Sequence, residues 1–276
     1  PYAVSLVGVS DIENITLTGS LSVDAAGNNL ANVIYGNSGS NAIYGYGGAD
    51  RLYGGEGDDI YFLGVSTDPL ITMTSMVFEV LAEGYDRVIT YDGGVLPDNV
   101  EFGQLRNYWN SIRHLVGNGL DNVLIGRPNP LQVFSGTGPV LEGDLLDGGP
   151  GADTLIGYSG VTFVLDNPGD EVILRTNASG LRTTVRTSVD HRLVAGVQDL
   201  VLTGTGMITG TGNESNNILD GSQNNAANLL VGRGGDDQYL LGIGDLVYEL
   251  ADGGADEVEF AYRANETGIS EYSVAE

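Results

Sequence analysis

The sequence contains no cysteine and no lysine. The absence of cysteine excludes disulfide bridges and all thiolate chemistry, both catalytic and metal-binding. The eleven basic residues are all arginine, and they face 37 acidic residues, which gives a net charge of −26. Such an acidic chain is repelled by nucleic-acid phosphates and also repels itself, which opposes compaction. We therefore expect no nucleic-acid partner, and we expect folding to require bound cations.

Long apolar stretches are also missing. No run of about 18 apolar residues exists, so we expect no membrane-spanning helix. The first residues lack the charged-then-apolar pattern of a secretion signal, and the sequence does not begin with methionine. We expect the chain to be a fragment or a processed product. Histidine is scarce, and neither His114 nor His191 has a second histidine at metal-ligand spacing.

Glycine, in contrast, is abundant: 43 residues of 276 are glycine, about twice the usual share of roughly 7%. Residues 27–62 read as four consecutive nonamers, GNNLANVIY, GNSGSNAIY, GYGGADRLY and GGEGDDIYF. Glycine opens each unit, Asn or Asp fills the sixth position, and a large apolar residue fills the eighth. The same template recurs at 148–156 (GGPGADTLI) and 232–240 (GRGGDDQYL). This repetition predicts a solenoid.

Each nonamer divides into a turn and a short strand. The glycine-rich half reverses the chain, which requires positive φ angles that glycine adopts readily. The second half alternates, so the apolar eighth residue points inward and its neighbours point outward. Two nonamers make one full coil, and turns two nonamers apart stack at the strand spacing of about 4.8 Å. The sequence therefore predicts an all-β fold, a parallel β-roll or β-helix solenoid built from glycine-rich nonapeptide turns.

The stacked turns also predict metal sites. Calcium takes 6–8 oxygen ligands, and here the sixth-position carboxylates and the carbonyl oxygens of the loop converge. Asn32 is expected to face Asp50 across one site, and Asn41 to face Asp59 across the next. An Asn amide oxygen can coordinate, although it can instead hydrogen-bond the neighbouring turn. The best candidate ligands are Asp50, Asp59, Asp153 and Asp237, followed by Asp58, Asp68, Asp144, Asp236, Asn32 and Asn41. The loop positions expected to contribute are Gly45, Gly47, Gly54, Glu56, Gly57, Gly148, Pro150, Gly232 and Gly234.

A longer period of roughly 90 residues overlies the nonamers. IENITLTG (12–19) recurs as VQDLVLTG (197–204), with NVEFGQLR (99–106) as a degraded middle copy. Each copy precedes an asparagine-rich stretch and then a full nonamer, followed by acidic segments such as VFEV with YDRV and GDLVYEL with ADEVEF. We predict three units, at 1–98, 99–196 and 197–276, cut from a longer array.

Two segments have an ambiguous pattern. Residues 67–84 and 106–116 show partial helical spacing of apolar residues, but strand is equally compatible with both. Elsewhere alternating Val, Ile, Thr and Tyr favour strands.

The nonamers GYGGADRLYGGEGDDIYF and LVGRGGDDQYLL resemble the hemolysin-type, or RTX, calcium-binding repeats. The longer unit resembles RTX arrays in large secreted bacterial proteins. The resemblance implies a parallel β-roll, several bound calcium ions, calcium-induced folding, type I secretion and an extracellular or cell-surface location. In that family the roll is usually an accessory part of a toxin, adhesin, surface-layer protein or exoenzyme.

Two other functions are compatible with parts of the sequence. GNSGS (36–40) and GYSGV (157–161) have the outline of a nucleophile elbow, but they lie within the nonamer register and lack its full frame. A β-solenoid polysaccharide lyase or epimerase is the enzyme alternative, although we expect no enzyme. Four arginines within 18 residues could grip an acidic polysaccharide, or could pair with the acidic surface: Arg175, Arg182, Arg186 and Arg192. The preferred interpretation is a calcium-binding, calcium-folded accessory region.

Overall fold

The structure is a computed structural model. It describes residues 2–64, 75–81, 84–91, 93–106, 113–128, 132–135, 138–141, 143–175, 181–250 and 253–260, with backbone alone at 132–135 and 138–141. The chain divides into two compact units. Unit 1 comprises Pro1–Trp109 and Arg113–Arg127, and unit 2 comprises Asn110–Ile112 and Pro128–Glu276.

All regular structure in the described ranges is β, and apart from one hairpin every observed strand pair is parallel. This confirms the predicted all-β parallel solenoid. In the part of the chain that the structure describes, no helix is long and apolar enough to cross a membrane.

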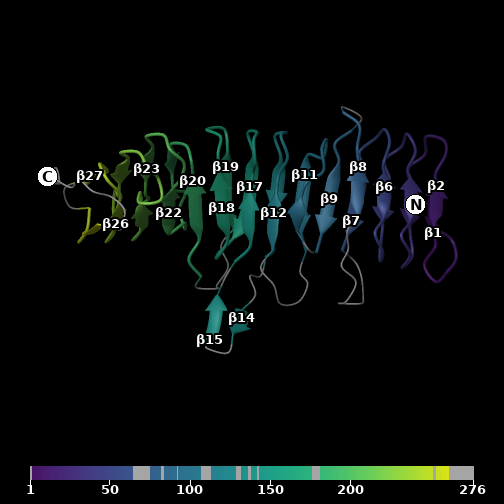
Figure 1. Ribbon diagram of the computed structural model, residues 1–276, viewed down its shortest axis with the longest axis horizontal. Helices are drawn as coiled ribbons and strands as arrows, with labels where there is room; N and C mark the ends of the chain where they lie inside the picture. The colour runs from purple at the N-terminus through teal and green to yellow at the C-terminus, as the bar shows by residue number, and fades with distance from the viewer. Residues whose placement is uncertain are drawn as a thin grey trace. The chain divides into compact units, whose positions relative to one another are not determined.

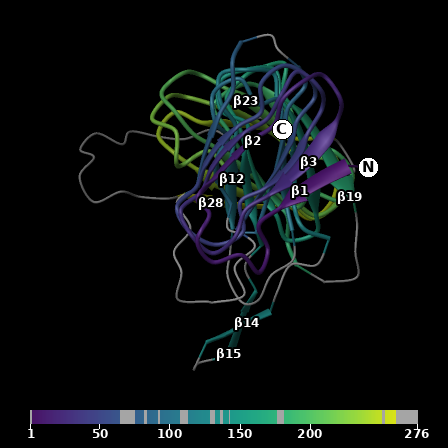
Figure 2. The ribbon, with the colours of Figure 1, turned by 90° about the vertical axis from the view of Figure 1, so that its right-hand side faces the viewer.

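Unit 1 stacks its strands as rungs, seen as the purple and blue arrows of Figure 1. Its largest sheet has the order β1-β3-β5-β7-β9-β11-β13, and smaller sheets have the orders β2-β4-β6-β8 and β10-β12. Odd and even strands alternate along the chain, so each coil contributes one strand to each of two faces (Figure 2). The strands are β1 (Tyr2–Ser5), β2 (Asn14–Thr16), β3 (Val23–Ala26), β4 (Val33–Tyr35), β5 (Ala42–Tyr44), β6 (Arg51–Tyr53), β7 (Ile60–Leu63), β8 (Met76–Phe78), β9 (Arg87–Thr90), β10 (Gly94–Val95), β11 (Phe102–Leu105), β12 (His114–Val116) and β13 (Val123–Ile125).

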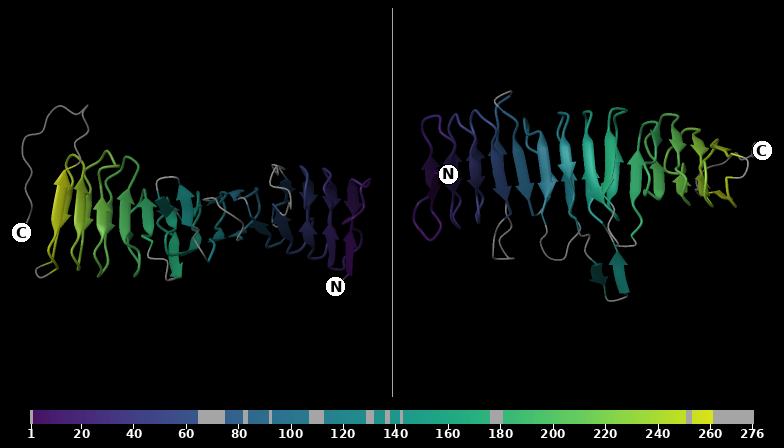
Figure 3. Two further views of the ribbon diagram at one scale, coloured as in Figure 1. Left: turned by 90° about the horizontal axis from the view of Figure 1, so that it is seen from below. Right: turned by 180° about the vertical axis from the view of Figure 1, so that it is seen from behind.

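Unit 2 repeats the design in the green and yellow part of the chain (Figure 3). Parallel pairing runs in the order β16-β18-β20-β22-β24-β26-β28 and in the order β21-β23-β25-β27, and β17 pairs with β19. An antiparallel hairpin, β14-β15, is the exception. The strands are β14 (Gln132–Ser135), β15 (Gly138–Leu141), β16 (Leu145–Asp147), β17 (Thr154–Tyr158), β18 (Thr162–Leu165), β19 (Glu171–Arg175), β20 (Thr184–Thr187), β21 (His191–Arg192), β22 (Asp199–Leu202), β23 (Thr209–Thr211), β24 (Ile218–Asp220), β25 (Leu229–Val231), β26 (Gln238–Leu241), β27 (Leu246–Tyr248) and β28 (Glu257–Phe260).

The eighth residue of each nonamer builds the core, as its alternation predicts. Ile34, Ile43, Leu52 and Tyr61 are each 0% exposed. Ile43 lies opposite Tyr61 in the β5–β7 pair, so equivalent side chains stack in columns inside the coil. Full burial of one such side chain contributes about 1.5–3 kcal/mol, and the column repeats this gain at every rung.

Aromatic side chains stack on the outward face of the β4-β6-β8 sheet. Tyr35 and Tyr53 are in register, as are Tyr53 and Phe78. Their ring centroids lie 4.6 Å and 4.7 Å apart, which is the spacing of neighbouring strands. The parallel register therefore fixes this stack, because identical positions fall directly above one another.

Each of the two ambiguous segments contains one short strand, β8 in the first and β12 in the second. Their other described residues, 75, 79–81, 84, 106 and 113, are in neither a strand nor a helix. Residues 67–74, 82–83 and 107–112 lie outside the described residues. The boundary between the compact units falls at residues 127 and 128, inside the second predicted repeat unit. The three units of roughly 90 residues remain a prediction about the sequence period.

Candidate metal centres

The sixth nonamer position forms a ladder through the turns. The backbone N–H of Asn41 donates to Oδ1 of Asp59 at 2.6 Å, and the N–H of Asp59 donates to Oδ1 of Asp86 at 2.9 Å. In unit 2 the N–H of Asn217 donates to Oδ1 of Asp237 at 2.7 Å. Asp59 and Asp237 thus each fix the backbone of the rung before them with one oxygen, which leaves the second carboxylate oxygen to face the turn.

Asparagine at the sixth position contacts the preceding rung in the opposite sense, as a donor. Asn32 Oδ1 accepts the N–H of Asn28 at 2.8 Å, while its Nδ2 donates to the carbonyls of Ile12 and Glu13 at 3.3 Å. Asn41 Nδ2 donates likewise to Val23 O at 2.8 Å. Both ends of these amides are occupied within the protein, so in this arrangement Asn32 and Asn41 stabilise their turns without a metal ion.

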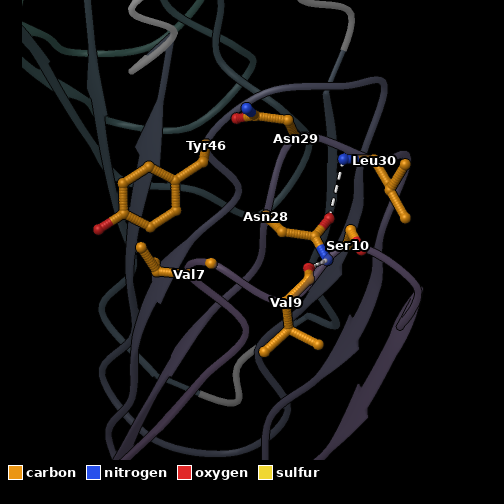
Figure 4. Close-up of a pocket in the computed structure, with 8 residues that line it drawn as sticks. Val7, Val9, Ser10, Asn28, Asn29, Leu30 and Tyr46 are labelled. Carbon is orange, nitrogen blue, oxygen red and sulfur yellow. Dashed lines mark hydrogen bonds between the residues drawn. The ribbon is translucent and has the colours of Figure 1, made fainter.

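A second asparagine reinforces the first turn, as Figure 4 shows. Asn28 Oδ1 accepts the N–H of Leu30, and its Nδ2 donates to the carbonyl of Val9, both at 2.8 Å. Asn118 and Asn213 make equivalent bonds to earlier carbonyls. Asn37 and Asn224 do the same, so this amide clamp recurs in all three predicted repeat units.

Three carboxylates meet at the last of the four consecutive nonamers of residues 27–62, which we call the first series. Asp59, Glu79 and Asp86 each offer an oxygen within 4.8 Å of the other two. Asp59 is 0% exposed, and within the described residues its Oδ2 has no hydrogen-bond partner. The hydroxyl of Tyr61 donates to Oε1 of Glu79, so the core tyrosine carries its polar end into the same place.

The matching group in unit 2 is Asp237, Glu249 and Asp256, again with oxygens within 4.8 Å of one another. Asp237 is 2% exposed, and its Oδ2 has no hydrogen-bond partner in the described ranges. The N–H of Asp237 donates to Oδ1 of Asp256 at 2.9 Å, and the hydroxyl of Tyr239 donates to Glu249. The two groups therefore share the same four residue types in the same contacts.

Burial and crowding of like charges disturb the ionisation of these groups. Burial, reinforced by the charges of Asp86 and Asp58, raises the pKa of Asp59 to about 7. Burial likewise raises the pKa of Glu79 to about 8, opposed by the hydrogen bond from Tyr61. The pKa of Asp237 rises to about 6, mainly through burial. Among the described residues, no positive charge offsets the burial of these three carboxylates.

The residues fit a calcium ion. Two oxygens on one calcium ion, each about 2.4 Å from it, lie up to roughly 5 Å apart, which accommodates the 4.8 Å limit of both groups. Gly54 leaves room beside them, because a Cβ atom at that position would overlap Asp59 Oδ2, the Tyr61 hydroxyl and Glu79 Oε1. Gly232 stands in the same relation to its own group. An all-oxygen, multiply charged donor set of this kind suits a hard cation.

The remaining predicted aspartates have different surroundings. Asp50 has both oxygens engaged, by the N–H of Asn32 at 2.9 Å and the hydroxyl of Ser75 at 2.9 Å. Asp153 is fully buried, and its N–H donates to Oδ1 of Asp170 at 3.0 Å. Asp144 is buried just before β16.

Two further aspartates of the described residues do not lie in either group. Asp58 and Asp236 are exposed and each accepts a backbone N–H at 2.9 Å, from Tyr85 and Ala255 respectively. Asp68 lies outside the described residues.

The predicted loop positions divide by exposure. The opening glycines of the nonamers are buried against the sixth residue, namely Gly45, Gly54, Gly148 and Gly232. Gly47 is buried against Asn29. Gly57 and Gly234 are half-buried, and Glu56 and Pro150 are exposed.

The second position adopts a left-handed backbone in the nonamers that have Asp at the sixth position, whether or not it is glycine. Gly55 has φ 98°, but Tyr46 has φ 64° and Arg233 has φ 85°. A side chain in this conformation costs on the order of 1 kcal/mol. Arg233 offsets part of that cost through hydrogen bonds from its guanidinium to Glu214, at 2.6 Å and 2.9 Å.

Glu79, Asp86, Glu249 and Asp256 were not among the sequence-based candidates. They come from the acidic segments that follow the Tyr-bearing nonamers, and in both segments the glutamate precedes the aspartate by seven residues. That shared spacing is the signal in the sequence that could have identified them.

The arginine cluster is partly engaged by acidic side chains. Arg182 Nε donates to both carboxylate oxygens of Asp199 at 3.0 Å. Arg175 and Arg192 are exposed, and Arg186 is half-buried. Burial lowers the pKa of His191, so this side chain is not a ready cation at neutral pH.

Comparison with protein families gives one match. The model of the RTX calcium-binding nonapeptide repeat matches four copies, over residues 26–61 and 142–161. No match was found among curated proteins or among solved structures. The first matched range contains the rungs of Asn32, Asn41, Asp50 and Asp59, and the second contains that of Asp153. Residues 26–61 and 142–161 therefore match RTX calcium-binding nonapeptide repeats, and they lie in a parallel solenoid of the kind that this repeat predicts.

Proposed function

We propose that the chain is a calcium-folded structural region of a larger secreted bacterial protein, in which the three repeat units act as an accessory roll. The rest of that larger protein would be a toxin, an adhesin, a surface-layer protein or an exoenzyme. The family match supports calcium binding itself. Export by a type I apparatus and an extracellular or cell-surface location belong to the proposal.

The observation that carries the proposal is the buried carboxylate of Asp59. Its Oδ2 is fully buried, has no hydrogen-bond partner in the described ranges, and lies beside Glu79 and Asp86. A buried carboxylate without compensation is strongly unfavourable, and two further carboxylates next to it increase the cost. Such a site is stable at neutral pH when a cation is bound.

Charge explains how calcium would control folding. Bound calcium supplies two positive charges and accepts 6–8 oxygen ligands. The carboxylates of Asp59, Glu79 and Asp86 repel one another and oppose closure of their turn when no ion is present. With 37 acidic residues against 11 arginines, the same repulsion acts along the whole chain. The chain would therefore stay open at the low calcium level of the cytoplasm and fold outside the cell.

The test is a calcium titration of chain stripped with EDTA, followed by far-ultraviolet circular dichroism and isothermal calorimetry. We expect a cooperative change from coil to β structure between micromolar and millimolar calcium, with heat that counts the sites. A β spectrum that is complete in EDTA and unchanged by calcium would overturn the proposal. Magnesium at the same concentrations serves as the control, because its small octahedral shell suits these turns poorly.

We propose no catalytic role. The chemistry gathered in the described residues is that of oxygen ligands at turns, and Arg182 of the arginine cluster is engaged by Asp199. A polysaccharide-binding role therefore has no specific contact in its favour.

A further inference from the structure

The opening glycines show where each series of stacked turns ends. A Cβ atom on Gly36 would meet Asn41 Oδ1 and the carbonyl oxygen of Gly54, two nonamers further on. A Cβ atom on Gly212 would meet Asn217 Oδ1 and the carbonyl oxygen of Gly232 in the same way. Gly27, Gly36 and Gly212, which open nonamers with Asn at the sixth position, thus each face one sixth-position oxygen and one backbone oxygen of the next stacked turn. The three atoms nearest a Cβ on Gly45 instead all belong to Asp50.

The pattern changes at the last nonamer of the first series. The three atoms nearest a Cβ on Gly54 are Asp59 Oδ2, the Tyr61 hydroxyl and Glu79 Oε1. Side-chain oxygens of Tyr61 and Glu79 therefore occupy the place that a glycine carbonyl of the next turn takes elsewhere. Asp86 completes the group with an oxygen within 4.8 Å of those of Asp59 and Glu79.

The last nonamer of unit 2 ends in the same manner. The atoms nearest a Cβ on Gly232 are Glu249 Oε1, the Tyr239 hydroxyl and Asp237 Oδ2. Asp256 supplies the remaining carboxylate. The same constellation has thus formed twice, from segments of different length.

Sequence spacing shows which parts of the constellation are fixed. Glutamate and final aspartate are seven residues apart in both cases, Glu79 to Asp86 and Glu249 to Asp256. Asp59 and Glu79 are 20 residues apart, whereas Asp237 and Glu249 are only 12 apart. A chance collection of surface acids would not keep the same contacts across an insertion of eight residues. A ligand bound by all four side chains would explain why both groups keep the same contacts.

We propose that each constellation is a terminal cation site, built of Asp, Tyr, Glu and Asp, that closes a series of nonamer turns. The three carboxylates bind one calcium ion, and the tyrosine hydroxyl provides a further oxygen from the core side. The site differs from a turn-to-turn site because two of its carboxylates come from the segment after the nonamers. The ion therefore fastens that segment to the roll. This inference rests on the proposed calcium-dependent function.

The nonamer at 148–156 provides a natural contrast. The three atoms nearest a Cβ on Gly148 all belong to Asp153, and Leu155 stands where the other sites have tyrosine. Seven residues before Asp170, the position of the glutamate is filled by Phe163. Among the described residues we therefore infer two terminal sites, one in unit 1 and one in unit 2.

The experiment measures binding of terbium to the full chain, with tyrosine excitation and calcium as competitor. Tyr61 and Tyr239 lie in the sites, so they are the main donors for sensitised emission. We expect two tight ions in the parent chain and one in each of the variants Glu79→Gln and Glu249→Gln. At the altered site, affinity should fall by more than the roughly 10–100-fold that loss of an outer-shell partner causes.

Matched controls separate a ligand from a general charge effect. Glu13→Gln and Glu257→Gln remove one exposed negative charge from each unit, outside the constellations, and both should keep two tight ions. Tyr61→Phe and Tyr239→Phe keep the buried ring and should each remove part of the sensitised emission and weaken calcium binding. Circular dichroism at saturating calcium shows that each variant still folds.

The outcomes distinguish this inference from the proposed function. If Glu79→Gln and Glu249→Gln bind as the parent chain does, or lose no more affinity than the controls, the terminal sites are overturned. Calcium-induced folding of the parent chain would then still stand. If the parent chain shows no response to calcium, both proposals fail together.

Discussion

The backbone N–H of Asn41 donates a 2.6 Å hydrogen bond to Oδ1 of Asp59, the equivalent residue two nonamers later. Asp59 at the sixth position therefore gives one oxygen to the backbone N–H of the preceding rung. Asn41 at the same position contacts its preceding rung in the opposite sense, because its Nδ2 donates to Val23 O while its Oδ1 accepts the N–H of Asn37 in its own turn. An amide group donates to carbonyl oxygens and closes the turn, whereas a second carboxylate oxygen leaves a site for a cation.

The substitution Asp59→Asn tests this distinction. The amide oxygen can still accept the N–H of Asn41, so the fold in EDTA should be as stable as the parent or more stable, because a buried charge is removed. Stabilisation by calcium should fall by the contribution of one site, about 2.7 kcal/mol at a concentration one hundred times its dissociation constant. Thermal unfolding in EDTA and in calcium measures both quantities. A large loss of stability in EDTA would contradict the assignment.

The converse substitution is Asn41→Asp. It removes the hydrogen bond from Nδ2 to Val23 O, which is 2.8 Å long, and places a carboxylate oxygen against that carbonyl. Stability in EDTA should fall by about 1–3 kcal/mol, the cost of an unsatisfied buried group. Millimolar calcium should restore part of the loss. Asn29→Asp is the control, because Asn29 is exposed in the neighbouring turn and gains the same charge. Equal losses in both variants would refute the argument.

Much of the fold follows from the nonamer pattern alone. Glycine at the first position, Asx at the sixth and an apolar residue at the eighth fix a turn, a rung and an inward column, and Ile34, Ile43 and Leu52 are buried accordingly. The ambiguous segments could not be assigned from periodicity, because a strand of three residues such as Met76–Phe78 is too short to show a period.

The candidate sites were only partly predictable. Asp59 and Asp237 were predicted from their place in the nonamer, and the structure puts both in carboxylate groups. Their partners Glu79 and Glu249 lie 20 and 12 residues away, so no fixed spacing links them to the repeat. Asp50 has a sequence context like that of Asp59, yet Ser75 hydrogen-bonds its second oxygen. The surroundings of these aspartates therefore depend on contacts between neighbouring coils, which the spacing within one nonamer does not reveal.

The raised pKa values predict opposite effects of pH with and without calcium. The folded-state pKa is about 7 for Asp59 and about 8 for Glu79, above the ordinary values of these groups. The metal-free fold therefore binds more protons than the unfolded chain between about pH 4 and about pH 8, and its stability should fall as pH rises through that range. Calcium requires the deprotonated groups, so its affinity should rise over the same range, with release of protons.

Chemical unfolding at several pH values, in EDTA and in calcium, measures these two slopes. Self-repulsion of the acidic chain acts in the same direction in EDTA, so the site-specific part is the difference between the parent chain and Glu79→Gln. That variant should show the weaker dependence on pH. Parallel curves for the two proteins would rule out Glu79 as a source of the effect.

Substitution of the opening glycine Gly54 should abolish calcium binding at its site while the rest of the fold is kept. In Gly54→Ala the new methyl group would overlap Asp59 Oδ2, the Tyr61 hydroxyl and Glu79 Oε1, so the oxygens must move apart. We expect loss of the tight calcium ion of unit 1 and destabilisation of about 1–3 kcal/mol, as for other overpacked positions. Gly206→Ala is the control, because nothing lies within 4 Å of a Cβ atom there. Calorimetry of calcium binding by both variants gives the answer: a Gly54→Ala chain that keeps its full number of ions would show that the space beside these oxygens is not where the cation binds.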